Sequence, residues 1–83
     1  MHKEIPPLSE LAQSIKLGIY KHYKGGMYKV LGIGRHTEEN QELVIYQSLE
    51  TNDIWIRPVE MFFEIVKTDN YQGPRFTPRE VGG

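Results

Sequence analysis

The chain has 83 residues, of which 25% are charged and 39% are hydrophobic, and its net charge is −1 with the histidines neutral. A chain of this length forms one small domain that buries about 60% of its unfolded surface, which excludes a catalytic domain with a separate cofactor domain. The absence of cysteine excludes disulfides and thiolate metal sites, and the balanced charge excludes a protein-wide positive field that would attract nucleic acid or anionic lipid.

Compartment follows from three further features of the sequence. The first residues, MHKEIPPLSEL, lack the apolar segment of a signal peptide. No apolar run approaches the roughly 20 residues that span a bilayer. Small secreted domains usually depend on disulfides, which this chain cannot form. We therefore expect a cytoplasmic protein with no membrane partner.

The N-terminal extension, residues 1–17, is predicted to hold one short helix. Ser9 is a suitable N-cap, and Gly18 is a suitable stop. The apolar residues between them recur at helical spacing, as Leu8, Leu11, Ala12 and Ile15. A helix of about two turns is unstable alone, so we expect it to pack on the rest of the domain.

From Gly18 onward the pattern changes to short runs rich in Tyr, Val and Ile, which is typical of strands. A polar loop, one turn and single glycines separate these runs. We expect five strands, at Ile19–Lys24, Met27–His36, Leu43–Leu49, Ile54–Arg57 and Phe63–Lys67.

Glycine and proline indicate how these strands connect. The pair Gly25-Gly26 predicts a hairpin between the first two strands. Gly32 and Gly34 predict a bulge or a sharp bend inside the second strand. Pro58 ends the fourth strand, and one helical turn is expected directly after it, over Val59–Phe62.

These elements predict a mostly β fold, a small SH3-like barrel of about five antiparallel strands over residues 18–67. Residues 68–83 are expected to be an irregular tail in which Pro74-Arg75-Phe76 docks, because Phe76 is a large apolar group in a polar segment. The alternative is an open antiparallel sheet with the N-terminal helix across one face.

The chain contains a series of short motifs in a fixed order: His22-Tyr23-Lys24-Gly25, Tyr28-x-Val30-Leu31-Gly32, Arg35-His36-Thr37-Glu38, Leu43-Val44-x-Tyr46, Trp55-x-Arg57-Pro58-x-x-Met61-Phe62 and Pro74-Arg75-Phe76. In these motifs the chain resembles the bacterial "domain of unknown function 1653" family. The motifs extend from about Gly18 to Phe76 and leave the N-terminal helix outside. The resemblance implies a small SH3-like domain and no established activity.

The stretch Trp55-Ile56-Arg57 is the most informative for function. If Ile54 and Ile56 face the core, alternation places Trp55 and Arg57 together on the other face as an apolar platform beside a forked cation. Alternatively, the N-terminal helix or Phe76 covers Trp55, and Arg57 pairs with Glu60 or Glu64. Alternation cannot fix the facing of Arg35 and His36 if the strand bends before them.

We interpret the chain as a non-enzymatic binding module for a protein or peptide partner, because small barrels leave no interior cavity for a substrate. Aromatic rings would supply contact area, and arginines would orient an anionic or carbonyl group. The candidate ligand-binding residues are Tyr23, Arg35, His36, Tyr46, Trp55, Arg57 and Arg75.

Two other functions remain open. A single-stranded nucleic-acid binder would use the same residues with Lys21 and Lys24, and its affinity would fall with salt. The barrel segment has six basic and seven acidic residues, so binding of nucleic acid would depend on a local basic face. A small hydrolase or metal site around His22 or His36 and Glu60 is the third, although their spacing shows no ligand motif. No catalytic residue, metal or cofactor is assigned.

Overall fold

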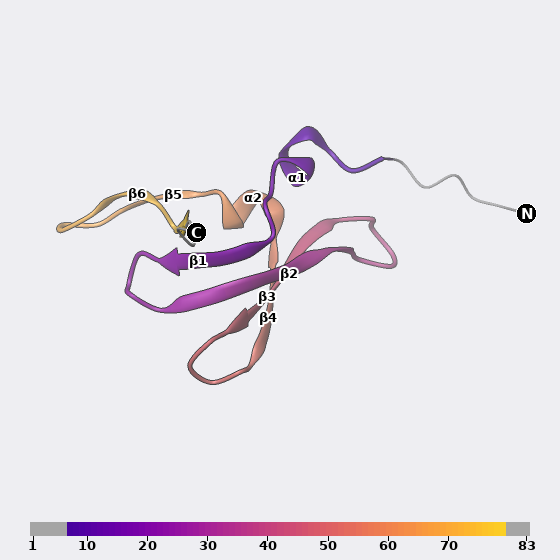
Figure 1. Ribbon diagram of the computed structural model, residues 1–83. Coiled ribbons are helices and arrows are strands. Elements are labelled where there is room, and N and C mark those ends of the chain that lie inside the picture. The colour runs from indigo at the N-terminus through magenta and orange to yellow at the C-terminus, as the bar shows by residue number, and fades with distance from the viewer. Residues whose placement is uncertain (1–6, 80–83) are drawn as a thin grey trace, which may run out of the picture.

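The computed structural model describes residues 7–79 of the chain. A five-stranded antiparallel sheet dominates it, with the strand order β4-β3-β2-β1-β7; Figure 1 labels the first four of these strands. Its strands are β1 (Gly18–His22), β2 (Met27–Arg35), β3 (Glu42–Ser48), β4 (Ile54–Pro58) and β7 (Phe76–Pro78). The remaining elements are α1 (Glu10–Gln13), α2 (Val59–Phe62) and a small second sheet of β5 (Ile65–Lys67) and β6 (Gln72–Pro74).

The mostly β class and the five antiparallel strands are confirmed, but the sheet is open, and residues 7–79 form no closed barrel. Strands β4 and β7 each pair on one side only. The expected position of the fifth strand is wrong. Its residues Ile65–Lys67 pair with β6 outside the main sheet, and β7 takes the place beside β1. The segment expected to be irregular therefore holds two strands. Neither helix within residues 7–79 is long and apolar enough to cross a membrane.

A β-bulge in β2 sets which residues face the core. The pairing with β3 passes from Val30 opposite Tyr46 to Gly32 opposite Ile45, so Leu31 is the extra residue. Before the bulge Val30 is buried, and after it Ile33 packs against the core. One extra residue thus reverses the alternation along the strand, as expected where a bulge interrupts a ladder.

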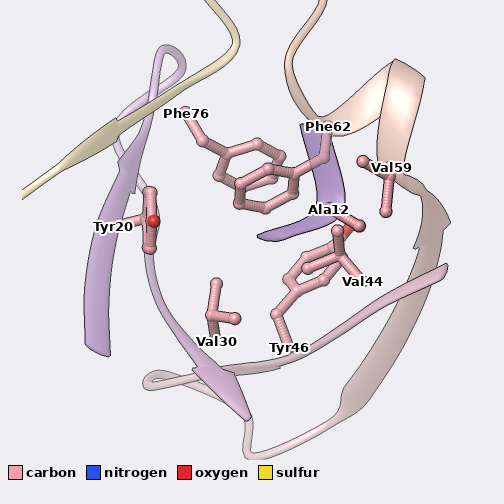
Figure 2. Close-up of a cluster of buried hydrophobic side chains, with 8 residues drawn as sticks. All are labelled: Ala12, Tyr20, Val30, Val44, Tyr46, Val59, Phe62 and Phe76. Atoms are coloured by element: carbon pink, nitrogen blue, oxygen red, sulfur yellow. The ribbon is translucent and has the colours of Figure 1, made fainter. Parts of the chain in front are cut away.

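The core lies between the inner face of the sheet, α2 and α1 (Figure 2). The rings of Phe62 and Phe76 stack at 4.4 Å, and Tyr20 meets Phe62 edge-on at 5.3 Å. The predicted docking of Phe76 is confirmed by its 5% exposure. The buried apolar residues are Ala12, Tyr20, Val30, Val44, Tyr46, Val59, Phe62 and Phe76.

The helix α1 is held by its cap and by β3. The Ser9 hydroxyl accepts a hydrogen bond from the Ala12 N–H, which confirms the predicted N-cap. Ser9 also donates from its N–H and its hydroxyl to the two carboxylate oxygens of Glu42, each at 2.6 Å. These bonds, with a smaller contribution from the charge of Arg35, lower the pKa of Glu42. The helix is shorter than expected and ends well before Gly18.

Candidate functional site

A cleft of about 200 Å³ opens on the inner face of the sheet, and all five strands contribute to it. Its lining residues are His22, Tyr28, Tyr46, Trp55, Arg57 and Phe76. A larger hollow of about 370 Å³ lies beside α1, but neither an aromatic ring nor a cation lines it, and its Glu42 is already bound by Ser9. The aromatic cleft is therefore a better candidate for recognition than the hollow beside α1.

The strand register places Trp55 and Arg57 in this cleft. Trp55 lies opposite Tyr46, and Arg57 lies opposite Val44, both of which are buried. Directly opposite residues share a face of the sheet, so Trp55 and Arg57 are on the core side. The condition that Ile54 and Ile56 face the core is not met, since their side chains are 58% and 61% exposed on the outer face.

Aromatic rings form the floor of the cleft. Phe76 lies at its centre, with ring-centroid distances of 4.9 Å to His22, 5.7 Å to Tyr28 and 5.3 Å to Tyr46. All three contacts are edge-on, which is a favourable arrangement for aromatic pairs. Trp55 is 51% exposed and forms the rim at the edge of the sheet. The floor is therefore fixed by core packing, and the rim is open to a ligand.

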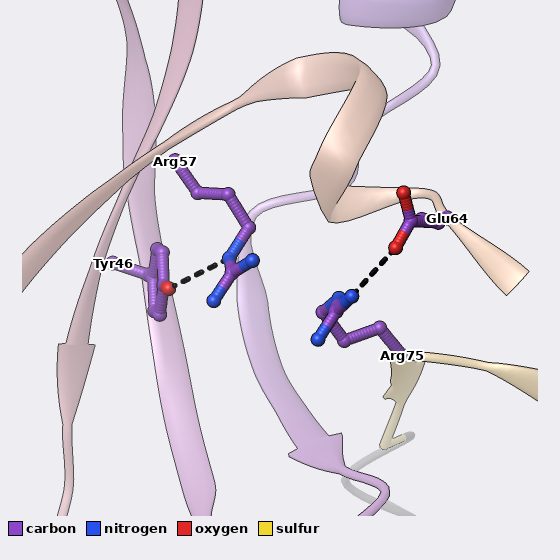
Figure 3. Close-up of polar contacts among 4 residues, drawn as sticks. All are labelled: Tyr46, Arg57, Glu64 and Arg75. Atoms are coloured by element: carbon purple, nitrogen blue, oxygen red, sulfur yellow. Dashed lines mark hydrogen bonds and ion pairs between the residues drawn. The ribbon is translucent and has the colours of Figure 1, made fainter. Parts of the chain in front are cut away.

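Two arginines extend toward each other beside this floor (Figure 3). Arg57 donates from Nε to the Tyr46 hydroxyl at 3.2 Å and forms no ion pair with any carboxylate of residues 7–79. Arg75 donates from Nη2 to Oε1 of Glu64 at 2.6 Å. The Nε of Arg75 is buried and has no hydrogen-bond partner within the described chain. One carboxylate thus accompanies two guanidinium groups, which leaves local positive charge.

The surroundings of His22 disfavour the charged form of its ring. Burial lowers its pKa below 6.5, and the charges of Arg75, Arg57 and Lys24 lower it further. Its Nδ1 accepts a hydrogen bond from the Lys24 N–H at 3.1 Å, which leaves the proton of the neutral ring on Nε2. The side chain therefore offers the cleft an uncharged aromatic ring with one donor.

Comparison with known proteins identifies the family. The sequence pattern described as "Protein of unknown function (DUF1653)" matches residues 18–78. The chain belongs to the DUF1653 family. A crystal structure of a DUF1653 protein from Bordetella bronchiseptica is similar to it, with 31% sequence identity and a TM-score of 0.75 over 82% of this chain and 91% of that one. None of the curated proteins matches the chain.

The predicted site residues of the DUF1653 domain fall into two groups, one at or near the cleft and one far from it. Tyr46, Trp55 and Arg57 line the cleft, and Arg75 lies close enough to lower the pKa of His22. Tyr23 lies next to them, with its ring 4.6 Å from His22.

Arg35 and His36 lie at the far end of β2, seven and eight residues beyond Tyr28, or roughly 20 Å in an extended strand. Arg35 is paired in register with Glu42. The Nδ1 of His36 accepts a hydrogen bond from the Glu38 N–H within the following turn. The structure therefore does not bring these two residues to the cleft of the DUF1653 domain.

Sequence reasoning missed three cleft residues of the DUF1653 domain: His22, Tyr28 and Phe76. The sequence suggests His22 only for a small hydrolase or metal site, with His36 and Glu60. Within residues 7–79 no three His, Asp or Glu side chains converge on a metal-sized site. The signal that could have found His22 is its alternation with buried Tyr20 on β1. The same alternation puts Lys21 on the outer face, away from the cleft.

Proposed function

We propose that the DUF1653 domain is a non-enzymatic binding module that holds an anionic peptide segment of a protein partner in its aromatic cleft. The observation that carries this proposal is Arg57, which lies beside the half-exposed ring of Trp55 without a carboxylate partner in the described residues. A planar guanidinium next to an apolar platform suits a carboxylate that adjoins an aromatic side chain or a proline.

The size and chemistry of the cleft support binding over catalysis. Pockets for small-molecule substrates usually measure about 300–1,000 Å³, whereas this cleft of about 200 Å³ accommodates one or two side chains. Its lining contains neither a carboxylate nor a serine, threonine or cysteine. The one serine within the expected barrel, Ser48, accepts hydrogen bonds from the N–H groups of Glu50 and Thr51 in a turn.

The test uses a random peptide library selected on the wild-type protein and counter-selected on a Trp55→Ala variant. Since Trp55 is the sole tryptophan, its fluorescence reports directly on the cleft. Selected peptides should be enriched in Asp or Glu next to aromatic residues or proline. Loss of a charge-assisted hydrogen bond in Arg57→Gln should weaken binding about 10- to 100-fold.

Lys29→Gln is the matched control, because it removes one positive charge from an exposed position on the outer face. It should leave peptide affinity within about twofold. Failure to enrich any peptide over the Trp55→Ala protein would rule out the proposed function. Equal losses in Arg57→Gln and Lys29→Gln would show that binding depends on total charge and not on the cleft.

Single-stranded nucleic acid is the second candidate, and the half-exposed Trp55 beside Arg57 favours it as a stacking platform. Of the two lysines expected to help, only Lys24 is on the cleft side, with Nζ 5.8 Å from the Tyr23 ring centroid. Amide NMR spectra with an oligothymidylate at low and high salt test it. Shifts at Trp55 and Arg57 that salt reverses would favour nucleic acid.

A further inference from the structure

The free edge of β4 lacks the usual protection of sheet edges. Three consecutive large apolar residues on this strand, Ile54, Trp55 and Ile56, are each more than half exposed. Edge strands normally carry lysine, proline or a bulge, or are very short. The other edge, β7, has three residues and includes Pro78. On β4 such features occur only at its C-terminal end, where the inward-facing charge of Arg57 precedes Pro58, so that residues 54–56 carry none.

The backbone of β4 offers a regular row of hydrogen-bonding groups at this edge. The Ser48 N–H donates to the Asp53 carbonyl across the β3–β4 hairpin, so the polar groups of Asp53 point toward β3. Antiparallel strands alternate this direction at every residue. Trp55 therefore also points toward β3, and Ile54 and Ile56 present their N–H and C=O groups to the outside.

One antiparallel register joins two such edges with matching charges. When Trp55 lies opposite Trp55 of a second copy, Ile54 lies opposite Ile56 and can exchange N–H···O=C bonds with it on both sides of the two-fold axis. In the same register Asp53 lies opposite Arg57, twice. The Asp53 carboxylate makes no hydrogen bond or ion pair within residues 7–79.

Other antiparallel registers that also place the outward N–H and C=O groups of the two β4 strands opposite each other are less favourable. A shift by two residues in either direction separates Asp53 from Arg57. In one direction it also brings Pro58, which has no N–H, into the ladder. The sequence Asp53-Ile54-Trp55-Ile56-Arg57 is thus complementary to itself about Trp55 in polarity, hydrogen bonding and charge.

We propose that the DUF1653 domain forms a two-fold symmetric dimer in which β4 pairs with β4 of a second copy. The two main sheets become one continuous sheet. The exposed apolar side chains of Ile54 and Ile56 extend a stripe on the outer face that already includes Ile45, which lies opposite Ile56. The two aromatic clefts come side by side across the axis, with Trp55 at their shared rim. This inference does not rest on the proposed function, and in the dimer the Arg57 guanidinium would be shared between the cleft and Asp53 of the second copy.

Sedimentation equilibrium of the full chain at micromolar to millimolar concentrations tests the dimer. The wild type should reach twice the monomer mass of 9.7 kDa. Asp53→Arg places like charges opposite each other twice and should weaken the dimer by at least about tenfold. The double variant Asp53→Arg with Arg57→Asp restores opposite charges and should recover the dimer.

A second pair of variants keeps the test valid if Asp53→Arg does not fold. Ile56→Lys places a charge on the free edge and should yield a monomer. Ile65→Lys is its matched control, because Ile65 is 62% exposed on β5, outside the main sheet; it should remain a dimer. Asp53 and Ile56 do not line the cleft. A wild-type protein that stays monomeric at millimolar concentration, or a dimer unaffected by both edge variants, overturns the inference.

Discussion

Replacing Phe76 by alanine should remove a large part of the stability of this domain. The side chain is 5% exposed, stacks on Phe62 and touches Tyr46 edge-on. Truncation of a buried phenylalanine costs about 3–5 kcal/mol, because the lost transfer free energy adds to that of the cavity left behind. The total free energy of unfolding for 83 residues is about 4–12 kcal/mol, so this one ring accounts for about a quarter of it or more.

Urea unfolding followed by far-UV circular dichroism and by Trp55 fluorescence measures the loss. Phe76→Leu keeps most of the apolar volume and should cost about 1–2 kcal/mol through the lost ring contacts. Thr77→Ala, at the exposed next position, should change stability by less than about 0.5 kcal/mol. A loss below about 1 kcal/mol for Phe76→Ala would refute the conclusion that β7 belongs to the cooperative core.

Three further changes test the site, the helix cap and a turn. Because His22 has a lowered pKa, the unfolded chain binds a proton at this residue before the folded chain does as pH falls. The free energy of unfolding should therefore decrease from about pH 6.5 down to the folded-state pKa, and in urea titrations His22→Gln should flatten that decrease. Glu42 also has a lowered pKa, and its contribution is lost as pH falls below 4.5 through the folded-state value; Glu42→Gln should remove this acid-dependent loss in thermal melts and lower stability at neutral pH. Gly25 has φ +111°, so Gly25→Ala should lower the free energy of unfolding by about 1–2 kcal/mol. Gly32→Ala is the control: nothing lies within 4 Å of the added carbon, and stability should change by less than about 0.5 kcal/mol. Equal losses in the two variants would contradict the turn geometry.

Local signals in the sequence predicted most of the elements. Ser9 marked the helix start because its hydroxyl can accept from the next turn. Pro58 marked the end of a strand because it lacks an N–H, and the helical turn after it occupies the predicted residues Val59–Phe62. Gly32 marked the place where β2 is irregular. Each of these signals depends on neighbouring residues only, and for that reason the sequence contained it.

The errors concern long-range pairing. Strand β7 has a short sequence with a proline and no alternation, and its position depends on Phe76 filling the core beside β1. The facing of Trp55 stays open in the sequence, because the isoleucines on both sides of it are also apolar. At the edge of an open sheet, the opposite residue Tyr46 decides the facing. Beyond the bulge, Arg35 could not be assigned to a face without knowing its partner, Glu42.

The pairing of β1 with β7 joins residues near the two ends of the described chain, since His22 lies opposite Phe76. During synthesis the first four strands of the sheet leave the ribosome before the residue that completes their core. The core must therefore remain incompletely packed until Phe76 has been made. Contacts so distant in sequence also slow folding, because a long loop must close before they form. We expect this domain to fold as a unit, after β7 has left the ribosome.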